Sequence, residues 1–71
     1  MSKALVAKRD TYINRMDNID VETFIPEGTW MFHITSPKQI KYLDPGEVCI
    51  YRPEHGLNFS YEGDWEEYKL P

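Results

Sequence analysis

The sequence is poor in cysteine and in long apolar runs, and both shortages narrow the class of protein. Cys49 is the only cysteine, so the chain cannot form an internal disulfide and is unlike a secreted cystine-rich domain. A reducing, cytoplasmic setting is therefore the expected location. No window approaches the roughly 18 consecutive apolar residues that a membrane span requires, and the first residues lack the apolar core of a signal peptide. We expect a soluble protein with no membrane partner.

Residues that could carry catalysis or hold a metal are equally scarce. Besides Cys49, the only soft or imidazole ligands are His33 and His55, and their spacing matches none of the paired motifs that mark metal sites. The four glycines are scattered, so no glycine-rich loop is available to hold a phosphate. A Cys-His nucleophilic pair would require the fold to bring Cys49 to one of the histidines. The sequence predicts a protein that is not an enzyme and uses no metal and no cofactor.

Charge of both signs is present, but it is unevenly distributed. The formal net charge is −4, yet residues 1–16 carry +3 and residues 44–71 carry −5. Phosphate backbones are bound by clustered lysine and arginine, so the acidic half is poorly suited to nucleic acid. It would instead attract a basic surface. We expect a protein partner with a basic surface.

Aromatic residues are the main resource for a core in a chain this short. At 71 residues there is room for one domain, spanning 1–71, and a domain of this size buries only about 60% of its unfolded surface. The 14% aromatic content compensates, since each aromatic side chain can bury a large area. Self-association into a homo-oligomer would be a further way to complete a small core.

The most apolar run follows the turn residues 26–28 and predicts a central strand over residues 29–35. Alternation places Trp30, Phe32 and Ile34 on one face of that strand, and Met31 and His33 on the other. Because the first set is bulkier and more apolar, we expect it to face the core.

The N-terminal segment leaves two alternatives open. Residues 2–16 fit an amphipathic helix capped by Ser2, but they also fit a first strand over residues 4–8 followed by a long excursion. Downstream, alternation predicts further short strands, one of which is covered on both faces, and a hairpin closed by residues 62–64. These strands span residues 21–25, 39–43, 47–52, 57–61 and 65–70, with 47–52 as the doubly covered strand.

Three short motifs resemble landmarks of SH3-like barrels. Ala4-Leu5-Val6 is similar to the start of the ALYDY motif, residues 25–29 to the diverging turn, and Glu62-Gly-Asp-Trp-Glu66 to the GDWW motif. Of the peptide-binding aromatics of that family, only Trp65 falls on a motif position. The resemblance implies an all-β fold, a small SH3-like, partly open barrel of about five short strands. The alternative is an α+β fold with an N-terminal helix packed on an antiparallel sheet.

The C-terminal acidic stretch is the candidate partner-binding site. It combines negative charge with aromatic anchors, the residue types that dominate interface hot spots. The same charges could simply protect a sheet edge against aggregation, and the two roles are compatible. The candidate residues are Glu62, Asp64, Trp65, Glu66, Glu67 and Tyr68.

We therefore expect a small acidic, non-enzymatic protein-binding module. By analogy with small phage or mobile-element proteins, it would act as an inhibitor or adaptor that occupies a basic groove on a larger host protein. The alternative function is binding of single-stranded nucleic acid or a small ligand through an aromatic barrel face. The aromatic candidates for that alternative are Tyr12, Trp30, Tyr42, Tyr51 and Tyr61.

Overall fold

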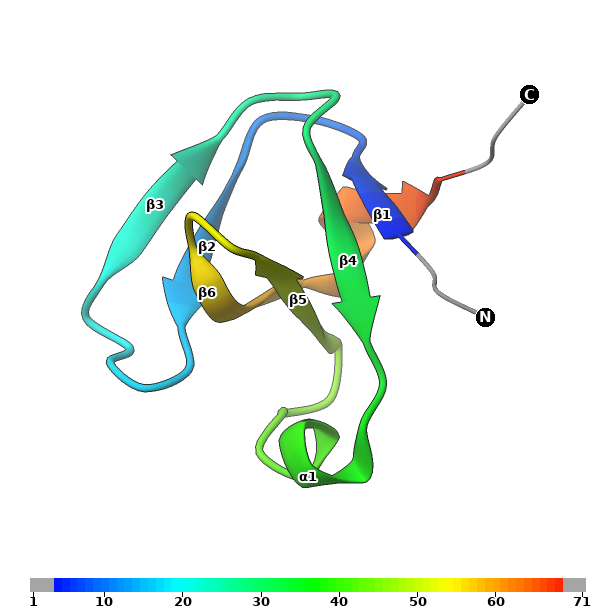
Figure 1. The fold of residues 1–71 in the computed structure, drawn as a ribbon. Coiled ribbons are helices and arrows are strands. Elements are labelled where there is room, and N and C mark those ends of the chain that lie inside the picture. The colour runs from blue at the N-terminus through cyan, green and yellow to red at the C-terminus, as the bar shows by residue number, and fades with distance from the viewer. Residues whose placement is uncertain (1–3, 69–71) are drawn as a thin grey trace.

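The structure is a computed structural model that describes residues 4–68, and in this part of the chain seven strands form a single antiparallel sheet (Figure 1). The strand order is β3-β2-β6-β5-β4-β1-β7, so the first and last strands are neighbours at one edge. The other regular elements of the described residues are one short α-helix and one short 3-10 helix. The elements are β1 Ala4–Ala7, β2 Thr11–Arg15, β3 Glu22–Ile25, β4 Trp30–Ile34, α1 Pro37–Ile40, β5 Glu47–Arg52, β6 Gly56–Tyr61, η1 Glu62–Asp64 and β7 Trp65–Glu67.

The all-β prediction is confirmed, and the α+β alternative is wrong. The N-terminal segment forms β1 and β2, joined by a short turn in place of the expected long excursion. Burial alternates along β1, where Leu5 and Ala7 are buried, and along β2, where Thr11 and Ile13 are buried. This period of two is that of a half-buried strand, and it outweighs the helical pattern of the same residues. The described sheet has seven strands, against the expected five or so.

The predicted strand at residues 29–35 is confirmed as β4, but the predicted core face is wrong. Met31 is 0% exposed, whereas Phe32 is 37% exposed and Trp30 is half-buried. The reason is the register with β1, which places Met31 opposite the buried Leu5. On the outer face, Trp30 packs edge-on against Phe32 with ring centroids 5.0 Å apart, and the Arg52 guanidinium covers the Trp30 ring at 4.5 Å. These contacts partly shield an apolar face that no second layer covers.

The strand expected at residues 39–43 is also wrong, because this segment contains α1 and a turn. Pro37 stands at the start of α1, where its missing N–H costs no hydrogen bond and its fixed φ suits the helix. No residue of α1 is buried. The segment projects beyond the end of β4, at the bottom of the view in Figure 1.

The strand expected at residues 47–52 is confirmed as β5, with cover on both of its faces. Three consecutive residues of β5 are buried, namely Val48, Cys49 and Ile50. Because successive side chains point to opposite faces, this burial requires side-chain contacts above and below the sheet. A tight connection joins β5 to β6, with Arg52 opposite Gly56. Gly56 has φ +71°, a left-handed conformation that favours glycine.

The predicted hairpin between residues 57–61 and 65–70 does not form. Strand β6 pairs with β5 and β2, and β7 crosses to pair with β1; residues 69 and 70 lie outside the described part of the chain. The usual three-residue hairpin loop ends on a residue at positive φ, commonly glycine, and Gly63 does not have a positive φ. Instead η1 carries the chain away from β6, and the Lys8 N–H donates to the Asp64 carbonyl at 2.8 Å.

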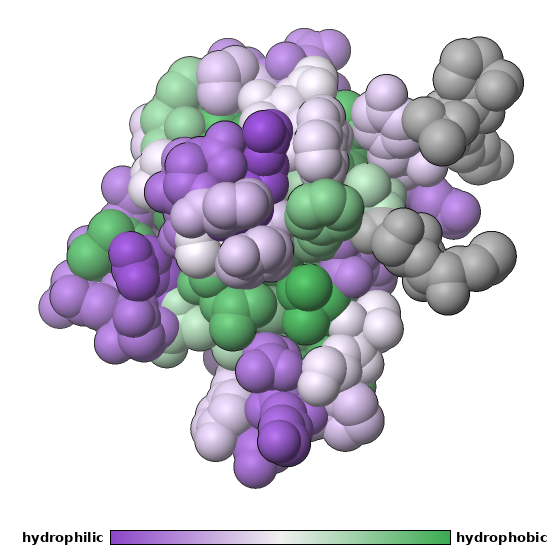
Figure 2. Space-filling model, viewed as in Figure 1, coloured by the Kyte–Doolittle hydropathy of each residue, from purple (hydrophilic) through white to green (hydrophobic). Residues whose placement is uncertain are grey.

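The inner face of the sheet supplies the core. Its buried apolar side chains come from six of the strands. The curved sheet therefore encloses the core by itself, without a second layer in the described residues. The space-filling view shows apolar side chains also exposed in a band over the outer face, between hydrophilic regions (Figure 2). The inner cluster consists of Leu5, Ala7, Ile13, Ile25, Met31, Val48, Ile50 and Trp65.

Candidate partner-binding surface

The indole of Trp65 belongs to the core and not to the surface. Its side chain is 5% exposed, and Nε1 donates a hydrogen bond of 2.9 Å to Ser60 Oγ. The Ser60 hydroxyl in turn donates to the Tyr12 carbonyl at 3.0 Å. Trp65 therefore ties β7 to β6 and β2, and it cannot be the exposed aromatic anchor that the sequence led us to expect.

Asp64 is also engaged within the fold. One carboxylate oxygen accepts a bond of 2.7 Å from the buried hydroxyl of Thr11, and the other accepts one of 2.6 Å from Arg9 Nη1. The Thr11 hydrogen bond and then the Arg9 guanidinium hold the pKa of Asp64 below its usual range. Because this carboxylate links the start of β7 to the β1–β2 turn, its first role is structural.

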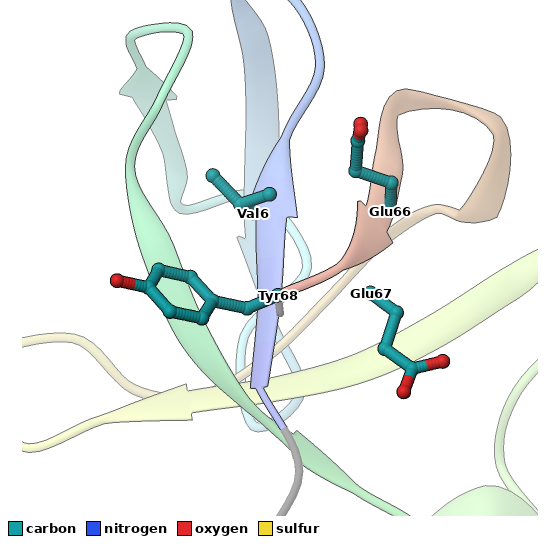
Figure 3. Close-up of a pocket in the computed structure, with 4 residues that line it drawn as sticks. All are labelled: Val6, Glu66, Glu67 and Tyr68. Carbon is teal, nitrogen blue, oxygen red and sulfur yellow. The ribbon is translucent and has the colours of Figure 1, made fainter. Parts of the chain in front are cut away.

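Glu66, Glu67 and Tyr68 remain at the surface and line a shallow depression together with Val6. The register places Glu66 opposite Val6 across β1 and β7. Figure 3 shows the Tyr68 ring reaching across β1 beside Val6, with the two carboxylates on β7 pointing away from each other. We call this group of four residues the acidic edge.

Within residues 4–68, no ion pair neutralises the carboxylates of the acidic edge. Ion pairs among residues 4–68 join Arg9 to Asp64, Arg15 to Asp17 and Arg52 to Glu54, and none of them includes Glu66 or Glu67. Both glutamates are exposed, and Tyr68 is 41% exposed. Two exposed carboxylates beside a half-exposed valine and a tyrosine ring form a mixed charged and apolar surface.

The backbone of β7 is accessible as well. Strand β7 is an edge of the sheet, and its bonds to β1 continue on one side with Tyr68 N–H donating to the Ala4 carbonyl at 2.9 Å. Because bonded and non-bonded pairs alternate in an antiparallel ladder, the N–H and C=O of Glu67 point away from β1. An extended segment of a partner could use these groups.

Glu62 lies apart from the acidic edge. Its side chain is exposed on η1, and its N–H donates to the Gly46 carbonyl at 2.8 Å. Of the six candidate residues, the structure thus brings three together at one depression. Sequence reasoning missed Val6, which the alternation with buried Leu5 and Ala7 could have placed on the outer face.

A second group of exposed aromatic side chains lies at the opposite edge of the sheet. Tyr12 and Phe24 are paired across β2 and β3, with ring centroids 5.5 Å apart in an edge-on arrangement. They are 54% and 49% exposed. Other exposed acids neighbour this pair, since Glu22 belongs to the same strand as Phe24.

The metal-ligating residue types do not assemble in the described part of the chain, where no group of three or more His, Cys, Asp or Glu side chains could hold an ion. Cys49 is fully buried, its Sγ lies 3.3 Å from Met16 Sδ, and burial raises the pKa of its thiol to about 11. A thiol in this state is a packing residue and a poor nucleophile.

Comparisons with protein-family models, with curated proteins and with solved structures found no match for this chain. Within residues 4–68, no helix has the length and apolar character needed to cross a membrane. Function must therefore be inferred from the chain's own geometry and charges.

Proposed function

We propose that this chain is a non-enzymatic protein-binding module whose acidic edge receives a basic segment of a partner protein. The observation that carries the proposal is the pair of exposed carboxylates of Glu66 and Glu67, which form no ion pair within residues 4–68, beside the accessible surface of Val6 and Tyr68. Lysine or arginine would pair with the carboxylates, and arginine could do so through two parallel hydrogen bonds. The aliphatic stem of either residue would pack on the valine and the tyrosine ring.

The overall charge supports the same kind of partner. A net charge of −4 favours encounter with a basic surface and disfavours other acidic proteins. The small domain would thus suit an inhibitor or adaptor that occupies a basic groove on a larger protein. Its rigid edge strand would present the charged groups at fixed positions, which lowers the entropic cost of binding.

We also propose that the sheet is a partly open SH3-like barrel. Ala4-Leu5-Val6 forms part of β1, and residues 25–29 form the end of β3 and the turn that leads to β4. The first and last strands pair at one edge, which brings the two ends of the described chain together. The similarity of residues 62–66 to GDWW carries no weight here, since these residues form η1 and the start of β7.

The proposed function can be tested with a fluorescent peptide rich in arginine and lysine. We expect fluorescence anisotropy to show binding by the wild-type protein that weakens as salt is raised, because screening reduces charge pairing. The variant Glu66→Lys with Glu67→Lys should bind at least about ten-fold more weakly, since attraction becomes repulsion at both positions.

A matched variant controls for net charge. Asp20→Lys with Glu22→Lys changes the charge by the same amount at two exposed positions just before and on β3, at the far edge of the sheet. This variant should retain the affinity to within about two-fold, as expected for charges outside the contact. Equal losses in both variants, or no binding by the wild type at low salt, would reject the acidic edge as the site.

A second candidate function is suggested by the exposed Tyr12–Phe24 pair. Aromatic faces on a small sheet can stack single-stranded bases, each worth about 1–3 kcal/mol. The carboxylate of the nearby Glu22 repels a phosphate backbone. The affinity for a single strand would therefore have to come mainly from stacking of its bases on the two rings. Anisotropy with a labelled oligothymidine should decide: binding lost in Tyr12→Ala would support it, and no binding at low salt would discard it.

A further inference from the structure

The α1 segment presents a surface that is complementary to the acidic edge. Lys38 and Lys41 are exposed and stand three positions apart, so their side chains leave the same side of a helical turn. Ile40 is 44% exposed and Tyr42 is 71% exposed. We call this group of four residues the α1 knob.

The lysines of the α1 knob are likewise outside the ion pairs of the described residues. None of the ion pairs among residues 4–68 includes Lys38 or Lys41, and the Lys41 ammonium lies 5.2 Å from the centre of the Tyr42 ring. The knob therefore offers two cations beside an isoleucine and a tyrosine. The acidic edge offers two anions beside a valine and a tyrosine.

The two surfaces lie apart in one molecule. Figure 1 shows α1 beyond the lower end of β4, while β7 lies beside β1, higher and to the right in the view. In the space-filling view, the α1 segment stands out from the body of the protein (Figure 2). A projecting knob and a shallow depression on separate sides can meet only between two molecules.

We propose that a second copy of this chain is a ligand of the acidic edge, with the α1 knob of one molecule docked on the acidic edge of the next. Such a head-to-tail contact pairs Lys38 and Lys41 with Glu66 and Glu67 and places Ile40 and Tyr42 on Val6 and Tyr68. Because the contact is heterologous, it produces a ring or an open chain of molecules. This inference rests on the proposed function, because it names an occupant of the same site.

Self-association of this kind would also regulate the site. A knob bound to the acidic edge excludes the basic segment of any other partner, so the two ligands compete. The small contact area and the net negative charge of each molecule both limit the affinity, and association is expected at protein concentrations of about 0.1–1 mM.

Sedimentation equilibrium with charge-swapped variants tests the proposal. The wild-type mass should rise above the 8.4 kDa of one chain as concentration increases. Glu66→Lys with Glu67→Lys makes both surfaces basic, and Lys38→Glu with Lys41→Glu makes both acidic, so each variant alone should remain monomeric. Their equimolar mixture restores opposite charges at every contact and should associate again. The Asp20→Lys with Glu22→Lys variant should associate like the wild type.

Two results would overturn the inference: a wild-type protein that stays monomeric up to about 1 mM, or two swapped variants that do not associate when mixed. The proposed function is judged separately by the basic peptide. The monomeric Lys38→Glu with Lys41→Glu variant keeps the acidic edge intact and should still bind that peptide. Peptide binding without self-association would leave the proposed function standing and remove only the second copy as its ligand.

Discussion

In the C-terminal acidic stretch, the side chains that face the fold stabilise it, whereas those exposed on β7 are available to a partner. On the inner side, Trp65 and Asp64 are held by hydrogen bonds to Ser60, Thr11 and Arg9. The carboxylates of Glu66 and Glu67 on the same short strand meet no cation in the described residues. Adjacent positions in the sequence therefore have opposite roles, because Asp64 and Trp65 are bonded within the fold, whereas Glu66 and Glu67 are exposed on an edge strand. The difference predicts that stability depends on the inner residues and binding on the outer ones.

The largest effect is expected at Trp65. Trp65→Ala should lower the free energy of unfolding by about 3–5 kcal/mol, because it leaves a large cavity in the core. Trp65→Phe keeps most of the volume but leaves Ser60 Oγ without its indole donor, and should cost less, about 1–2 kcal/mol. Urea denaturation measures both. A loss below 1 kcal/mol in the alanine variant would contradict the buried position of the indole.

Strand β4 extends the comparison to its own two faces. Met31→Ala should lower the free energy of unfolding by about 2–5 kcal/mol, because Met31 is fully buried. Phe32→Ala should lower it by only about 1 kcal/mol, because the ring is partly exposed on the outer face. Denaturant titrations of the two variants should rank them in this order, and the reverse order would restore the Trp30-Phe32-Ile34 face as the core.

A smaller and pH-dependent effect is expected at Asp64. Its pKa is lowered in the folded state, so its contribution is present above the ordinary aspartate pKa and is lost as the pH falls through the folded value. Asp64→Asn should cost about 1–3 kcal/mol at pH 7. Thermal unfolding from pH 7 down to about pH 2 should show a shallower decline for the variant than for the wild type. Parallel curves would mean that the carboxylate is not engaged with Thr11 and Arg9.

The smallest effect on stability is expected at the outer carboxylates. Glu66→Gln with Glu67→Gln should change the free energy of unfolding by less than about 0.5 kcal/mol, since both side chains are exposed and form no ion pair within residues 4–68. The same variant should weaken binding of the basic peptide. A stability loss comparable to that of Asp64→Asn would show that the division between the inner and outer sides is not real.

The sequence was informative about where several strands lie, but ambiguous about which face is buried in a strand that has apolar residues on both faces and is covered on only one. The strand over residues 47–52 and its double cover were predicted correctly because its apolar residues are continuous. In β4, both alternating sets are apolar, and the bulkier set lies outside because the register with Leu5 fixes Met31 inward. Register is a long-range property, so alternation within one strand does not reveal it.

The candidate site shows a similar limit. Its exposed acids could be located from charge and strand signals. Which residues are engaged in the fold (Asp64 and Trp65) and which stay exposed (Glu66 and Glu67) depends, however, on the strand that pairs with β7. Apolar runs around a glycine-containing turn favoured a hairpin with residues 57–61, whereas η1 directs the chain to β1. The role of Asp64 depends on Thr11, which lies 53 residues earlier in the sequence. No local pattern contains such a contact.

The most direct test of the division between the two sides is an NMR titration of the ¹⁵N-labelled protein with the basic peptide. We predict that the amide signals of Val6, Glu66, Glu67 and Tyr68 shift in proportion to the bound fraction, while those of Tyr12 and Phe24 stay in place. Shifts concentrated on β2 and β3, or no shifts at peptide concentrations that saturate the anisotropy signal, would contradict the assignment of the acidic edge as the binding surface.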